Sequence, residues 1–217
     1  MLAWAALTFI TAVVWPGVLC AFAGGSDSST APEEKARALL DAHLATLKGA
    51  QRGRVEPITD EALAQALPSL SFFVVRFRDY PVRSAPPPLK SQNVFVVAAK
   101  AGTVQRVSDV EALQTLFRSA LAPVKDESKA KEALRAWLRV VEEFYQDGFM
   151  QFALPAENRS TAFKGEELRV SGDAVATKGG DGKITATLAF DKRGKLVEAK
   201  TSGRVEPKGA RPAGPGR

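Results

Sequence analysis

The stretch that decides the fold is residues 184–203, which read ITATLAFDKRGKLVEAKTSG. Apolar residues occupy alternate positions in its first part: Ile184, Ala186, Leu188 and Phe190. This period of two is typical of a strand that buries one face. Residues 191–194 (Asp-Lys-Arg-Gly) are of the types that supply a positive φ in a hairpin turn. A second strand is predicted over residues 196–201, so the stretch predicts an antiparallel hairpin.

A third strand and a long helix are predicted immediately before this hairpin. The strand covers residues 168–176, and the glycine-rich residues 179–182 form the turn that follows it. The helix covers residues 129–145, where apolar side chains recur at helical spacing. They are Ala130, Leu134, Trp137, Val141 and Phe144. With residues 151–164 as a loop, the second half predicts a helix followed by a three-stranded meander.

The first half predicts the same order of elements. A helix begins at a capping box in residues 30–33 and ends at Gly49, and a short helix covers residues 60–67. Strands are predicted over 71–78, 93–99 and 104–107, the first of them half buried. A helix follows from a second capping box at 108–111 and ends before Pro123. The fold class predicted is therefore α+β, with helices packed on antiparallel meanders in two helix-then-three-strand halves.

Two stretches resemble the small helix-plus-meander modules of bacterial secreted proteins, which are PepSY-like or cystatin-like. They are VFVVAAKAGTVQRV at residues 94–107 and ITATLAFDKRGKLVEAKTSG at residues 184–203. The resemblance is one of pattern, and no residue role is carried over from it. It implies a module that inhibits or binds other proteins. The pentapeptide Gly-Arg-Val-Glu-Pro also occurs twice, at 53–57 and 203–207, which we interpret as coincidence.

The N-terminal residues predict export. No charged side chain occurs before Asp27, and Ala21-Phe22-Ala23 has the small residues that a signal peptidase requires. We predict a signal peptide at 1–23 that is removed after Ala23, then a flexible linker at 24–32. Two alternatives are a lipoprotein acylated at Cys20 and an uncleaved membrane anchor, because the apolar run is nearly long enough to span a bilayer.

The remaining chain divides at its composition changes. We predict one α+β module at 33–122, a second at 123–203 and a disordered, basic, Gly/Pro-rich tail at 204–217. The tail carries Arg204, Lys208, Arg211 and Arg217 against Glu206, within a formal net charge of +6 for the whole chain. Such a tail could attach weakly to an anionic surface, with a strong dependence on salt.

The residue types limit the chemistry that the chain can perform. Cleavage after Ala23 would remove Cys20, the single cysteine, and would leave His43 as the single histidine. Transition-metal sites use several His or Cys ligands. Phosphate-binding loops need glycines that are missing here, because Thr177 and Ala189 stand at those positions. We therefore predict no cofactor, no metal and no catalytic residue.

The leading functional prediction is a non-catalytic binding protein of the cell envelope or periplasm, with a protein or envelope-polymer partner. No nucleic-acid partner is expected, and membrane contact is expected only through an uncleaved or lipidated N-terminus. The alternative is an envelope hydrolase that uses Glu143 and Asp147, which lie four residues apart on one helix face. The simpler interpretation places both carboxylates on a solvated face. A third possibility is a structural envelope protein held by its tail.

Overall fold

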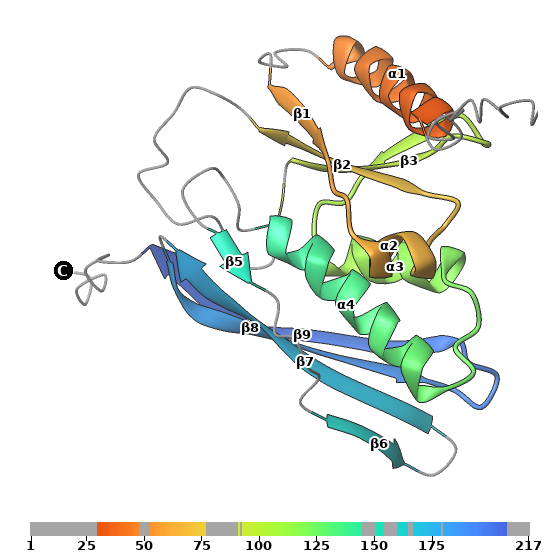
Figure 1. The fold of residues 1–217 in the computed structure, drawn as a ribbon, viewed down its shortest axis with the longest axis vertical. Helices are drawn as coiled ribbons and strands as arrows, with labels where there is room; N and C mark the ends of the chain where they lie inside the picture. Colours follow the sequence, from red (N-terminus) through yellow and green to blue (C-terminus); the bar gives the residue numbers. More distant parts are fainter. Residues whose placement is uncertain are drawn as a thin grey trace, which may run out of the picture.

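A computed structural model describes residues 30–47, 53–76, 91, 93–144, 151–153, 160–164, 167–178 and 180–207. Over these ranges the chain forms helices and two antiparallel sheets, so the predicted α+β class is confirmed. The elements stack in four layers, which Figure 1 shows from top to bottom as a helix, a sheet, a group of helices and a second sheet. Residues 1–29, which include the predicted signal peptide and Cys20, lie outside the described part.

The first sheet has the strand order β1-β2-β3-β4, in which neighbours along the chain pair with each other. The strands are β1 (Arg54–Pro57), β2 (Ser71–Arg76), β3 (Val94–Ala98) and β4 (Thr103–Arg106). The sequence predicts no strand at β1, so the three-stranded meander expected in the first half is one strand short. The residues of β1 are the first copy of the repeated pentapeptide, and they pair with β2 along the whole strand.

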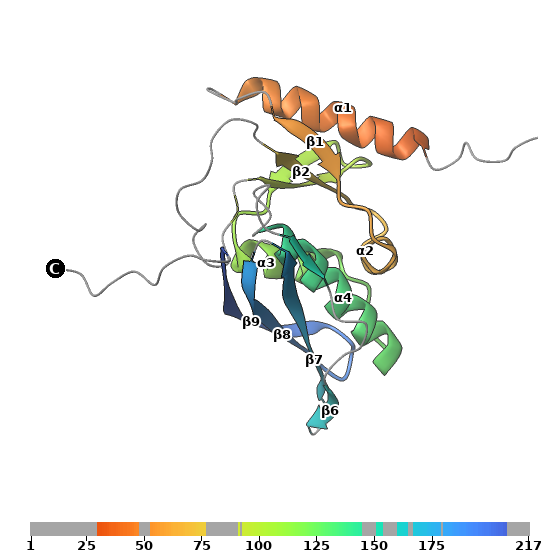
Figure 2. The same cartoon turned by 60° about the vertical axis from the view of Figure 1, so that its left-hand side comes forward.

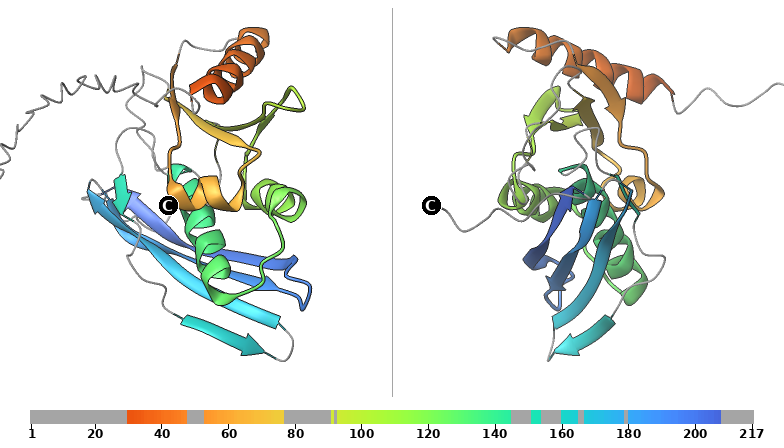
Figure 3. Two further views of the ribbon diagram at one scale, coloured as in Figure 1. Left: turned by 45° about the vertical axis from the view of Figure 1, so that its right-hand side comes forward. Right: turned by 90° about the vertical axis from the view of Figure 1, so that its left-hand side faces the viewer.

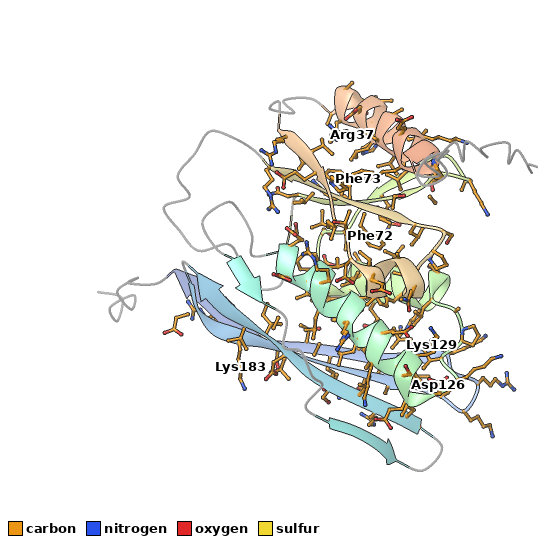
Figure 4. The ribbon with its side chains drawn as sticks, in the orientation of Figure 1. Arg37, Phe72, Phe73, Asp126, Lys129 and Lys183 are labelled. Carbon is orange, nitrogen blue, oxygen red and sulfur yellow. The ribbon has the colours of Figure 1, made fainter. Side chains whose placement is uncertain are left out.

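Strand β2 is buried on both faces, so the prediction of a half-buried strand is wrong. Phe73 and Val75 point toward helix α1 (Thr30–Thr46) and pack in a cluster with Ala36 and Leu40. Phe72 and Val74 belong to the larger core on the opposite side. Figure 4 shows Phe72 and Phe73 on opposite faces of the sheet. Period-two alternation identified the strand, but it cannot show that a helix covers the second face.

Three helices form the layer beneath the first sheet: α2 (Glu61–Ala66), α3 (Val110–Ala120) and α4 (Glu127–Glu143). Each begins after an aspartate whose side chain accepts a hydrogen bond from the third amide beyond it: Asp60, Asp109 and Asp126. These carboxylates satisfy amides that have no partner inside the helix. The predicted capping box at 108–111 therefore uses Asp109 rather than Ser108.

The second sheet has the order β5-β7-β8-β9, and β6 pairs with another part of β7. Its strands are β5 (Gln151–Ala153), β6 (Ser160–Lys164), β7 (Glu167–Lys178), β8 (Gly180–Phe190) and β9 (Leu196–Pro207). The β7–β8–β9 meander is confirmed. The loop predicted at 151–164 instead holds β5 and β6. Strand β9 continues to Pro207, four residues into the segment predicted as tail.

One hydrophobic core crosses the predicted module boundary at residues 122–123. It joins Phe72 and Val94 of the first sheet to Trp137 of α4 and to Ile184 and Leu188 of the second sheet. Figures 2 and 3 show α4 lying between the two sheets from three further directions. Buried residues occur all around α4 rather than along one stripe, as expected for a helix that packs on two sides.

Candidate functional site

Glu143 of the predicted acid pair is the last residue of α4 and is buried there. Its side chain is 2% exposed, so the simpler interpretation of a solvated carboxylate is wrong for this residue. Asp147 lies outside the described residues, and the pairing of the two carboxylates stays a prediction. A buried ionised carboxylate needs charged partners, because leaving water is costly for a lone charge.

Two guanidinium groups supply those partners. Arg76 Nη2 donates to Glu143 Oε2 at 2.9 Å, and Arg139 Nη1 donates to Glu143 Oε1 at 2.7 Å. Arg139 lies four residues before Glu143, which places both on one face of α4. Arg76 ends β2 two residues beyond Val74, so it shares the face that points toward α4.

The contacts continue from Arg76 into β1. Arg76 Nε donates to Glu56 Oε2 at 2.8 Å, and Arg54 forms an ion pair with the other oxygen of Glu56. We call Arg54, Glu56, Arg76, Arg139 and Glu143 the ionic cluster. It joins β1, β2 and the C-terminal end of α4, which are far apart in the sequence. Neighbouring Glu142 is also buried, 3.7 Å from Arg139.

The cluster shifts the pKa values of two of its members. The hydrogen bond from Arg76 lowers the pKa of Glu56 most strongly, and it outweighs the opposing effect of burial. Burial by itself would lower the pKa of Arg76, but the charge of Glu143 and the hydrogen bonds to Glu56 and Glu143 raise it overall. Both shifts favour the charged forms of the two groups.

This geometry suits a structural role better than proton transfer. Each oxygen of Glu143 already accepts a charged hydrogen bond, whereas a general acid or base must reach a substrate proton. Removing one member would leave a buried charge without its counterion, which is strongly destabilising. The cluster therefore holds the first sheet against α4.

A second group of charged residues lies on the outer face of the second sheet, on the side away from α4. Exposed residues of three adjacent strands gather there: Val175 of β7, Lys183 of β8, and Lys200, Ser202 and Arg204 of β9. The register places Val175, Lys183 and Arg204 in one row across the sheet. We call these five residues the basic patch. Figure 4 shows Lys183 pointing away from the helices.

Asp173 lies beside the basic patch and is almost fully buried, although it belongs to the same outer face. Thr185 Oγ1 donates to Asp173 Oδ1 at 2.6 Å, and Lys183 Nζ lies 3.8 Å from Asp173 Oδ2. Ser171 and Thr187 share a hydrogen bond of 3.0 Å in the next row. These short polar side chains hold the surface under the exposed cations in place.

His43 has a packing environment. It is partly buried on α1, and its ring meets the ring of Phe95 edge to face at a centroid distance of 6.2 Å. Trp137 is fully buried in the core, where it packs against Phe117 and donates from Nε1 to Thr201 Oγ1 at 2.9 Å. Both residues act through packing in this arrangement.

Sequence reasoning missed most of the ionic cluster and the basic patch. Arg76 falls in a predicted strand, but its partner Glu56 lies in β1, which four residues of mixed character did not reveal. The repeated pentapeptide was an available signal, because both of its copies form strand here. The basic patch follows from the register of three strands, which period-two alternation alone does not fix.

The described residues contain no group of three or more His, Cys, Asp or Glu side chains that could hold a metal ion. Among the helices of the described part, none has the length and apolar character needed to cross a bilayer. Comparison with protein-family models, with curated proteins and with solved structures found no match to this chain. The resemblance to PepSY-like or cystatin-like modules therefore stays a prediction.

Proposed function

We propose that the chain is an exported, non-catalytic binding protein whose partner is an acidic protein segment or an anionic envelope polymer. The observation that carries the proposal is the basic patch. Lys183, Lys200 and Arg204 are exposed on a sheet face that no described helix covers, whereas the first sheet is covered on both faces (Figure 1).

The patch has properties that favour binding to an anionic surface. Its cations project from paired strands, so less backbone freedom is lost when a partner binds. Val175, 42% exposed, adds an apolar contact at the end of the row. The side chains of Lys183 and Lys200 are 51% and 72% exposed, which leaves both accessible to a polyanion.

The hydrolase alternative has less support. Glu143 is its central residue, and both oxygens of that carboxylate are held by Arg76 and Arg139. Export rests on residues 1–23, through cleavage after Ala23, acylation at Cys20 or an uncleaved anchor. The intact mass of the protein recovered from its native host distinguishes these three routes.

The proposed binding is tested with poly-L-glutamate as a model polyanion. The protein is titrated at low and high ionic strength, and the double variant K183Q/K200Q is compared with K100Q/R193Q. The control removes the same charge from turns outside the basic patch. We expect the patch variant to bind roughly tenfold more weakly than the control, and binding to weaken as salt rises. Equal binding by the two variants, or no binding by the wild type, would contradict the proposal.

A further inference from the structure

Strand β9 forms an unusually long edge of the second sheet. It has 12 residues, pairs with β8 on one side and is last in the strand order. In Figure 2 no coloured element lies beside its other edge. The edges of the first sheet, β1 and β4, have four residues each. Proteins usually keep exposed edge strands short or cover them, because unpaired backbone groups attract another strand.

Little of the β9 edge is covered within the described part. Arg118 donates from Nη2 to the carbonyl oxygen of Val197, near the start of the strand. On β1, by comparison, Arg37 Nη1 donates to Val55 O at 3.0 Å, and Pro57 ends a strand only four residues long. Beyond Val197, alternate peptide groups of β9 point away from β8, as in any antiparallel edge strand.

The charges of β9 complement each other when the strand meets itself. In an antiparallel pair, directly opposite residues share a face. A two-fold axis through Thr201 therefore places Glu198 opposite Arg204 of a second copy, twice by symmetry, and Lys200 opposite Ser202. An axis through Lys200 would bring that residue opposite itself, and an axis through Ser202 would bring Lys200 opposite Arg204.

Two further registers also pair opposite charges, but they use less of the strand. An axis through Ala199 sets Glu198 opposite Lys200 and leaves residues 203–207 without a partner. An axis through Gly203 sets Lys200 opposite Glu206 and places Glu198 beyond the end of β9. The axis through Thr201 pairs residues 196–206, nearly the whole strand, and so satisfies the most backbone groups.

We propose that β9 pairs with β9 of a second copy about an axis at Thr201, forming a symmetric dimer with one continuous sheet. A symmetric dimer uses the same surface on both copies, which this register provides. Thr201 is already fixed by the hydrogen bond from buried Trp137, so the centre of the interface is ordered before pairing. Glu198 accepts from Arg169 and Lys200 within the chain, and a carboxylate has room for one more donor.

The test uses charge reversal in protein purified from cells that express all 217 residues. The single variants E198R and R204E each place like charges opposite each other in the homodimer. Mixing the two variants restores opposite charges at both positions. The introduced arginine of one copy then meets the introduced glutamate of the other, and native Arg204 meets native Glu198. R193E is the control, since it makes the same charge change as R204E in the β8–β9 turn. Circular dichroism verifies that each variant is folded.

Sedimentation velocity over a micromolar concentration series gives the outcome. We expect the wild type and R193E to dimerise, each single reversal to weaken the dimer on the order of tenfold, and the mixture to recover it. A wild type that stays monomeric would overturn the proposal, and so would a dimer that responds to neither reversal or that mixing does not restore. None of these results depends on whether poly-L-glutamate binds the protein.

Discussion

At the scale of single residues, the carboxylate of Glu143 depends on its two guanidinium partners. A lone buried charge is costly, and the hydrogen bonds from Arg76 and Arg139 compensate for the lost water. Sequence reasoning selected Glu143 because of its spacing to Asp147. It could not predict the burial, because Arg76 reaches Glu143 from a strand 67 residues away in sequence.

Replacing Glu143 by glutamine removes the charge and keeps the size of the side chain. We expect E143Q to lower the free energy of unfolding by about 3 kcal/mol, because two buried guanidiniums lose a counterion. E132Q, on the same helix, loses a surface pair with Lys129 and should cost about 0.5 kcal/mol or less. Urea unfolding measures both variants. Equal stability of E143Q and E132Q would show that the buried pair contributes little.

The ionic cluster also predicts how stability depends on pH through Glu56. Its pKa in the folded chain lies below the ordinary value of 4.5, so the unfolded state binds the proton more tightly. The stability that Glu56 contributes is therefore complete above pH 4.5 and is lost as the pH falls through the folded pKa. Urea unfolding between about pH 3 and pH 7 should show wild type and E56Q converging toward acid pH. A constant difference would contradict the prediction.

At the scale of elements, the turn between β8 and β9 is attached to the connection between α3 and α4. Val124 N donates to Gly194 O at 2.8 Å, and Gly194 has a φ of 74°. A Cβ added at Gly194 would lie 2.2 Å from the carbonyl oxygen of Val124. The glycine thus serves both the turn conformation and the close approach of two backbones.

Comparing two alanine substitutions separates these two effects. Gly102, in the β3–β4 turn, has a φ of 66° and nothing within 4 Å of an added Cβ. We expect G102A to cost about 1 kcal/mol from backbone conformation alone. G194A should cost about 3 kcal/mol, because the overlap with Val124 adds to that strain. Thermal unfolding followed by circular dichroism measures both, and equal costs would show that the turn moves away freely.

The elements that sequence predicted are those with long, regular patterns. Helix α4 and the β7–β8–β9 meander have many periodic positions, and local turn residues mark their ends. Strand β1 has four residues, and β5 has three, which is too few for a period to appear. Their strand conformation depends on pairing with β2 and β7, which is a tertiary effect.

At the scale of the whole molecule, α4 makes the two predicted modules share one core. The cluster around Trp137 contains residues from both sheets and from α2 and α3. The sequence repeated one order of elements twice, and this suggested two separate modules. It could not show that the second module's helix also packs on the first module's sheet, because this contact leaves no local pattern.

The shared core predicts one cooperative unfolding transition for the described part. Urea unfolding of a W4F/W15F variant reports on Trp137 through fluorescence and on both sheets through circular dichroism, and the two curves should coincide. A chain that begins at residue 123 should fail to fold, because it exposes the side of α4 that packs against α2 and the first sheet. Separate transitions, or a folded fragment, would show that the halves are independent.

The position of α4 between the sheets also sets an order of events during synthesis. Phe72, Val74 and Val96 are made well before α4, so their face of the first sheet stays exposed to water while the ribosome adds the next residues. At about 5–20 residues per second, this period lasts several seconds. A nascent chain with a bare aromatic surface is a substrate for chaperones. The N-terminal half should therefore depend on them until residue 143 has emerged.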